Sequence, residues 1–227
     1  MKTLFLFLIN SLLISAYSQT TTIEYKLQRN ISEKKLKEQP GFAKKAFSKD
    51  YFYILTYSND IVEYKINDSI KDNESYLDYE KNEVIRIDKS MQKYIYKDLK
   101  KNITYSKLNS FDETLNIKDS LIDRKWKITS ETKIINGLVC KKAISKIFKV
   151  KTYAWFTEEI NIKTGPDLFD GLPGLILEIN TEHLNWIATS LKTELKDSII
   201  KKPEFTGKIY TFKEGKKITK EKLLNRY

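Results

Sequence analysis

Apolar and polar residues alternate with a period of two along most of the chain from residue 20 onward. Between residues 22 and 28, Ile23, Tyr25 and Leu27 fall on one face and polar residues fall on the other. This alternation is typical of a β-strand that buries one face. About eleven such segments, separated by residues that favour turns, predict a mainly β domain of antiparallel strands. We expect a single curved sheet or half-open barrel, and a two-sheet β-sandwich is the alternative architecture.

Helical patterns are few and short. Ser32 could cap a first helix, which would have to end at Pro40 because proline offers no backbone donor. Near the C-terminus, Thr219 is a second candidate cap, followed by a pair of leucines that could pack on the sheet. The sequence therefore predicts one or two short helices beside the sheet.

The first 18 residues follow a different pattern. Lys2 precedes an apolar run over residues 4–14, and Ala16 and Ser18 are small residues placed where a signal peptidase requires them. This is typical of a secretory signal peptide, and the run is too short to cross a membrane as a helix. We therefore expect cleavage near Ser18 and export to the periplasm or the extracellular space. Residues 19–227, in which we find no linker or repeat, are expected to form one domain without a membrane span.

The composition restricts the partners of the exported chain. The formal net charge is +11, but the lysines come as scattered pairs and form no dense stripe. A solvated basic surface is the simpler interpretation, and export makes a nucleic acid an unsuitable partner. The single cysteine, Cys140, leaves the chain without an internal disulfide. None of these features predicts an oligomeric state.

Residues 165–179 (GPDLFDGLPGLILEI) break the alternation. Asp170 and Gly171 form a turn pair in which glycine can take a positive φ, and the next residues suit a type II turn with a positive φ at Gly174. The segment is predicted to be a rigid double turn, in which Asp167 and Asp170 would be solvated. A binding role is the alternative, since sites concentrate in loops. The candidate residues for either role are Trp155, Gly165, Pro166, Asp170, Gly171, Leu172, Pro173 and Gly174.

These segments resemble the GLPGLI family of exported proteins from Bacteroidetes-type bacteria. The matching stretches are residues 140–143, 154–157, 165–166 and 171–177, together with the C-terminal KKITKEKLL. Two positions depart from the family pattern: members usually have Ile-Pro-Ile at residues 160–162 and Gly-Arg at residues 151–152. The family has no characterised activity, so the resemblance implies an exported β protein and no particular reaction.

The residue types that most catalytic sites need are scarce. A cysteine nucleophile would require Cys140 beside His183, the only histidine, but Cys140 occupies a strand position typical of a small buried residue. A zinc site needs several cysteine or histidine ligands, and no loop spacing supports calcium at Asp167 and Asp170. The chain also lacks the G-x-S-x-G elbow of serine hydrolases. We expect no metal and no cofactor.

Two hypotheses of function remain. The first is a non-enzymatic binding or accessory module of the periplasm or cell surface, acting on an unidentified envelope ligand or protein. The alternative is an envelope hydrolase, which would use two carboxylates of the loop over residues 165–174 and its flanks. The acids available to it are Glu158, Glu159, Asp167, Asp170 and Glu178. A concave pocket would favour the first hypothesis, and two convergent carboxylates in a cleft would favour the second.

Overall fold

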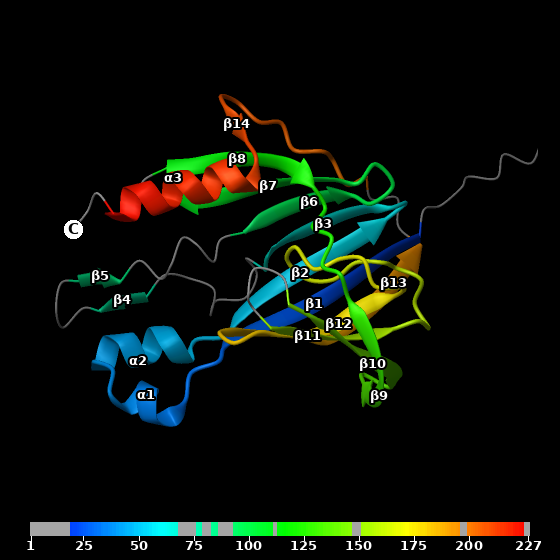
Figure 1. The fold of residues 1–227 in the computed structure, drawn as a ribbon, viewed down its shortest axis with the longest axis horizontal. Helices are drawn as coiled ribbons and strands as arrows, with labels where there is room; N and C mark the ends of the chain where they lie inside the picture. The colour runs from blue at the N-terminus through cyan, green and yellow to red at the C-terminus, as the bar shows by residue number, and fades with distance from the viewer. Residues whose placement is uncertain are drawn as a thin grey trace, which may run out of the picture.

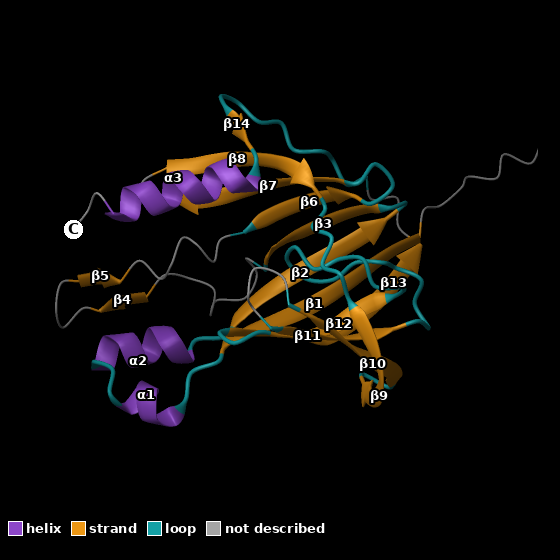
Figure 2. Cartoon of the chain, in the orientation of Figure 1, coloured by secondary structure: helices purple, strands orange, loops and turns teal. Residues whose placement is uncertain are grey.

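The computed structural model describes residues 19–67, 76–78, 83–85, 93–110, 113–146, 151–195 and 199–224. The predicted signal peptide lies outside these described residues. Strands dominate the described chain (Figure 2). They are β1 (Gln19–Arg29), β2 (Tyr51–Ser58), β3 (Ile61–Ile66), β4 (Tyr76–Asp78), β5 (Glu83–Ile85), β6 (Tyr94–Asp98), β7 (Ile103–Ser110), β8 (Glu113–Ser120), β9 (Lys127–Ile135), β10 (Leu138–Ser145), β11 (Thr152–Thr157), β12 (Leu175–Asn180), β13 (Leu184–Leu195) and β14 (Ile209–Tyr210). The helices are α1 (Glu33–Lys37), α2 (Gly41–Ser48) and α3 (Phe212–Leu224).

Twelve strands form one curved sheet in the order β14-β8-β7-β6-β3-β2-β1-β13-β12-β11-β10-β9 (Figure 1). The sheet is open, because β14 and β9 stand at opposite ends of this order. The predicted mainly β fold with a single curved sheet is therefore confirmed, and the two-sheet sandwich is not formed by the described residues. The strand pairs are antiparallel except for β14 and β8, which are parallel. Strands β4 and β5 pair with each other outside the large sheet.

The helices begin and end for local reasons. Ser32 caps α1 as predicted, its hydroxyl accepting a hydrogen bond from the Lys35 amide at 3.3 Å. Pro40 separates α1 from α2, a position it tolerates because the first turn of a helix needs no donor there. The C-terminal helix begins earlier than predicted, since Thr211 and Glu214 form a capping box: Glu214 accepts from the Thr211 amide at 2.7 Å. None of the helices in the described residues is long and apolar enough to span a membrane.

The core lies on the face of the sheet that the alternation assigns to it. Tyr25 on β1 is fully buried, and its hydroxyl donates a hydrogen bond to the carbonyl of Ile176 at 2.5 Å. The rings of Phe169 and Trp186 meet edge to face with centroids 5.3 Å apart. The segment between β11 and β12, yellow-green in Figure 1, therefore packs on this face of the sheet, and its Ile162, Phe169 and Leu172 belong to the core.

Candidate functional site

A buried ion pair fixes the predicted double turn to the sheet. Lys97 on β6 is fully buried, and its ammonium donates to the Asp170 carboxylate at 2.8 Å. It also donates to the Thr164 hydroxyl and the Gly165 carbonyl, both at 3.2 Å. The three protons of the ammonium therefore each have an acceptor, which is what a buried lysine requires. We call residues 164–174 the anchored loop.

The expectation that Asp167 and Asp170 are solvated turn residues is wrong. Asp170 is 3% exposed and also accepts a hydrogen bond from the Thr164 hydroxyl at 2.5 Å. Asp167 is 8% exposed and forms a short ion pair with Lys93. Asp167 pairs with Lys93, which precedes β6, and Asp170 pairs with Lys97 on β6. Both acids therefore connect the loop to the sheet.

Sequence reasoning missed Lys97, although the pattern contained a signal for it. Lys97 lies two residues after Ile95, on the face of β6 that the alternation buries. A lysine at an inward position requires a carboxylate partner. The missing information was which acid would provide it, because Asp170 is 73 residues away along the chain.

Three glycines of the loop are needed for different reasons. Gly171 has φ of +88°, as the turn pattern predicts. Gly174 does not have a positive φ, which corrects the predicted type II turn. A Cβ at Gly174 would lie 1.9 Å from the carbonyl oxygen of Thr157, so close packing against β11 excludes a side chain. A Cβ at Gly165 would similarly lie 2.6 Å from the Cβ of Ile176.

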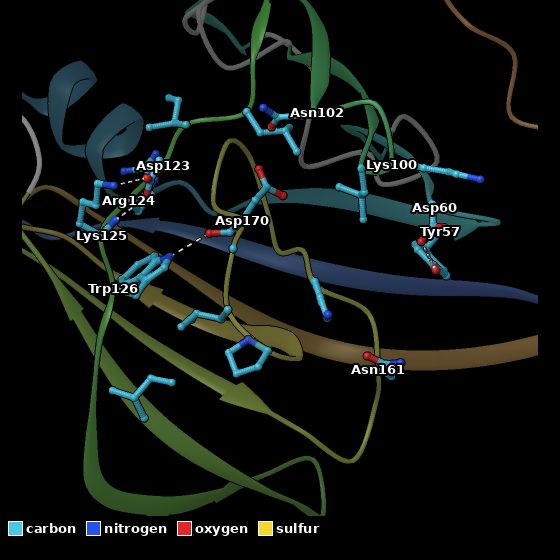
Figure 3. Close-up of a pocket in the computed structure, with 18 residues that line it drawn as sticks. Tyr57, Asp60, Lys100, Asn102, Asp123, Arg124, Lys125, Trp126, Asn161 and Asp170 are labelled. Carbon is cyan, nitrogen blue, oxygen red and sulfur yellow. Dashed lines mark hydrogen bonds and ion pairs between the residues drawn. The ribbon is translucent and has the colours of Figure 1, made fainter.

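A pocket of about 930 Å³ opens beside the anchored loop (Figure 3). Residues 170–173 of the loop form one wall and residues 121–126 form another. The turns at Asp60 and Asn102, which join β2 to β3 and β6 to β7, contribute the rim together with Asn161 and Lys163. Among the sequence-predicted site residues, Asp170, Gly171, Leu172 and Pro173 are therefore brought together at one pocket.

Residues 121–126 are clamped onto the anchored loop by two side chains. The indole N–H of Trp126 donates to the backbone carbonyl of Asp170 at 2.8 Å (Figure 3). Nε and Nη2 of Arg124 both donate to the carbonyl of Leu168, at 3.2 and 3.0 Å. The Arg124 guanidinium also stacks over the Phe169 ring, 4.0 Å from its centroid. The two walls of the pocket thus hold each other in place.

The acids named for the hydrolase hypothesis do not converge on this pocket. Glu158 pairs with Lys141 and Glu178 pairs with Lys133, each at 2.6 Å. Glu159 accepts a hydrogen bond from the backbone amide of Val139 at 2.8 Å. Together with the paired Asp167 and Asp170, the whole predicted set of acids is engaged within the described structure.

Two further carboxylates line the pocket. Asp60 accepts a hydrogen bond from the Tyr57 hydroxyl at 3.1 Å, and Asp123 pairs with Lys125 at 2.5 Å. Hydrogen bonds from the Lys125 side chain and backbone lower the pKa of Asp123 below its ordinary value. A carboxylate held ionised in this way is a poor general acid, which needs a raised pKa.

Trp155 lies on the opposite face of β11 from the pocket. It alternates with Ala154 and Phe156, both fully buried in the core. On its own face it lies beneath the ammonium groups of Lys133 and Lys142, 4.4 and 5.7 Å from its ring. Trp155 therefore belongs to a separate surface, and Gly165, Pro166 and Gly174 are likewise absent from the pocket lining.

Cys140 and His183 occupy very different environments. Cys140 is fully buried on β10, where its thiol contacts the Leu138 carbonyl at 3.6 Å and burial raises the thiol pKa to about 11. His183 is exposed at the predicted hairpin tip between β12 and β13. The described residues contain no cluster of three or more metal-ligating side chains.

An open curved sheet, a loop anchored in its core and a pocket beside that loop define a β domain with a candidate ligand site. The chain matches the family described as "N-glycanase peptide, N-terminal domain" over residues 44–211, and it belongs to that family. The sequence-based assignment to the GLPGLI family is overturned by this match and is wrong. No curated protein matches the chain.

Two solved structures of PNGF-II, in space groups C2 and P21, share the fold. The first has a TM-score of 0.56 and 18% sequence identity, covering 89% of this chain and 33% of that one. The second has a TM-score of 0.55 and 19% identity, covering 89% and 34%. The chain thus spans about a third of the length of these structures. At this level of identity the likeness concerns the fold alone.

Proposed function

We propose that this protein is an exported, non-enzymatic module that binds a glycan in the pocket beside the anchored loop. The observation that carries the proposal is the state of the pocket: it is large, and the carboxylates that line it already have internal partners. Such a pocket can position a ligand, but it offers no pair of free acids for hydrolysis. The pattern of residues 1–18 supports export, and an envelope glycan or glycoprotein is the partner we expect.

The lining of the pocket suits a sugar. Trp126 and Tyr57 bring aromatic surface, which packs against the C–H faces of a sugar ring. Asn102 and Asn161 bring amides, which both donate and accept hydrogen bonds as hydroxyl groups do. The family description, which names an N-glycanase, supports a glycan as the ligand class.

A hydrolase is the weaker candidate for this chain. Catalysis by two carboxylates requires one acid to hold a proton while the other stays ionised. Hydrogen bonds from Lys125 lower the pKa of Asp123, and Asp170 is occupied by its buried ion pair with Lys97. From the family description we therefore take the class of ligand, a glycan, and we do not propose that this module catalyses its release.

Calorimetric titration of the purified protein with free N-glycans and N-glycopeptides tests the proposal. Trp126→Ala should weaken binding by roughly tenfold or more, since it removes an aromatic wall. Asn161→Ala, at an exposed position on the rim, should weaken binding without disturbing the fold. Trp155→Ala is the matched control, because it removes a half-buried tryptophan from the opposite face of the sheet.

Equal losses for Trp126→Ala and Trp155→Ala would contradict a site in this pocket. Mass spectrometry of the same mixtures checks the alternative. Release of the glycan from a glycopeptide, abolished by Asp60→Asn or Asp123→Asn, would establish hydrolysis and overturn the non-enzymatic proposal.

A further inference from the structure

Positive charge in the pocket exceeds negative charge. Of the three carboxylates in the lining, Asp123 pairs with Lys125 and Asp170 pairs with Lys97. Asp60 then remains as the single acid without a cationic partner among the described residues. Against it stand three lining cations for which no ion pair occurs in the described chain: Lys100, Arg124 and Lys163.

Arg124 is the most informative of these cations. Its Nε and Nη2 atoms donate to the Leu168 carbonyl, and its plane rests on the Phe169 ring. Nη1 donates none of the hydrogen bonds found among the described residues, and Arg124 lines the pocket. The guanidinium is therefore held in a fixed orientation with part of its donor fork still available.

The acids nearest to Arg124 each form an ion pair with another cation. Asp167 is paired with Lys93, and Asp170 is paired with Lys97. Burial lowers the pKa of Arg124 while these two carboxylates act in the opposite direction, and the guanidinium stays charged at neutral pH. A half-buried cation without its own counter-ion is stabilised when an anion binds beside it.

We propose that the pocket binds an anionic group of its ligand, a carboxylate or sulfate carried by an acidic glycan, against Arg124. Lys100 and Lys163 on the rim supply positive potential that attracts the anion. This inference rests on the proposed function, because it names the class of glycan that the same pocket takes.

The chemistry of arginine favours this assignment. A guanidinium presents its donors in a plane that matches carboxylate and sulfate oxygens, and charge-assisted bonds of this kind are roughly twice as strong as neutral ones. Because Arg124 is half-buried, its attraction for an anion is screened less than that of a surface lysine. Lys100 and Lys163 are exposed, so their contribution should fall as the salt concentration rises.

Titration with three oligosaccharides of the same length tests the inference: a neutral one, one containing a uronate and one carrying a sulfate. We expect an acidic oligosaccharide to bind roughly tenfold more tightly than the neutral one at low salt, with the preference shrinking as salt is added. The uronate and sulfate arms show which anion fits better.

Variants show which residues cause the preference for the acidic oligosaccharide. Arg124→Gln should reduce the affinity for the acidic oligosaccharide to that of the neutral one. Lys163→Gln should reduce the preference roughly two- to threefold, and Lys220→Gln on α3 is the matched control that removes an exposed lysine elsewhere. If Arg124→Gln fails to fold, the Lys163 and Lys220 variants decide, because both positions are exposed.

The outcomes separate this inference from the proposed function. Equal affinity for neutral and acidic oligosaccharides would overturn the anionic subsite and leave glycan binding intact. Binding of none of the three would overturn both. If Lys163→Gln and Lys220→Gln reduce the preference equally, the preference reflects the net charge of the protein. That result would also overturn the subsite.

Discussion

Cations on the two sides of the anchored loop differ in pairing: Lys97, which faces the sheet, forms an ion pair, and Arg124 and Lys163, which face the pocket, do not. On the side facing the sheet, Lys97 and Asp170 are 0% and 4% exposed in their side chains and form an ion pair, in which Oδ1 of Asp170 accepts from Lys97 and Thr164 while its buried Oδ2 has no hydrogen-bond partner among the described residues. On the side facing the pocket, Arg124 and Lys163 line the pocket and form no ion pair among the described residues. The inner side therefore stabilises the fold, and we propose the outer side as the ligand site.

Removing the inner cation should have the largest effect. Lys97→Ala leaves Asp170 as an uncompensated buried charge and should lower the free energy of unfolding by about 3–5 kcal/mol. Urea denaturation measures this loss, and Lys163→Ala on the pocket side should change stability by less than about 0.5 kcal/mol. Similar urea midpoints for the two variants would contradict the claim that the sheet-facing lysine stabilises the fold more than the pocket-facing one.

Adding a methyl group at the base of the loop should have the next largest effect. Gly174→Ala places a Cβ against the Thr157 carbonyl, so strand β11 must shift, at about 1–3 kcal/mol. Gly171→Ala meets no neighbouring atom but forces alanine to a positive φ, at about 1 kcal/mol. A larger loss at Gly171 than at Gly174 would show that backbone angle, not packing, governs this turn.

The outer of the two lysine–aspartate pairs should contribute little. Lys93 is 30% exposed in its side chain, so water and salt screen its attraction for Asp167. Lys93→Ala should cost less than about 1 kcal/mol, and the loss should shrink in high salt. A loss as large as that of Lys97→Ala, unaffected by salt, would contradict the importance given to burial.

Ionisation of the Cys140 thiol should change stability only at alkaline pH. Its pKa is raised from an ordinary value of 9.0 to about 11, so it stays protonated in the folded state until strongly alkaline pH. The corresponding stabilisation is complete below pH 9 and is lost as pH rises toward 11, because only the unfolded thiol ionises in that window. Labelling by a thiol reagent should be slow at pH 7, and rapid labelling there would indicate an exposed thiolate.

The sheet could be predicted because alternation is a local property. Tyr25, Cys140 and Gly171 each show in the structure what their immediate neighbours imply: an inward strand position, a buried small residue and a turn with positive φ. The same rules failed at Gly174, where the requirement for glycine comes from the carbonyl of Thr157 on another strand. Turn glycines followed by an apolar strand, as at residues 171–177, meet local requirements of backbone angle and close packing. For this reason the motif did not identify the family.

The candidate site could be predicted only in part. The sequence drew attention to residues 170–173, which do line the pocket. It did not indicate Arg124 or Trp126, because nothing in their own segment shows that it folds against the loop. Contacts between segments more than 40 residues apart decide which side chains face a ligand, and alternation does not encode them.

Chemical-shift mapping by NMR tests most directly whether the pocket is the ligand site. Titration of an isotope-labelled sample with an acidic oligosaccharide should shift the backbone amides of residues 121–126 and of Gly171 and Leu172, together with the indole N–H of Trp126. The amides of Tyr153 and Trp155, on the opposite face of β11, should not move. Shifts confined to the Trp155 face, or cleavage of the oligosaccharide during the titration, would contradict a binding pocket beside the anchored loop.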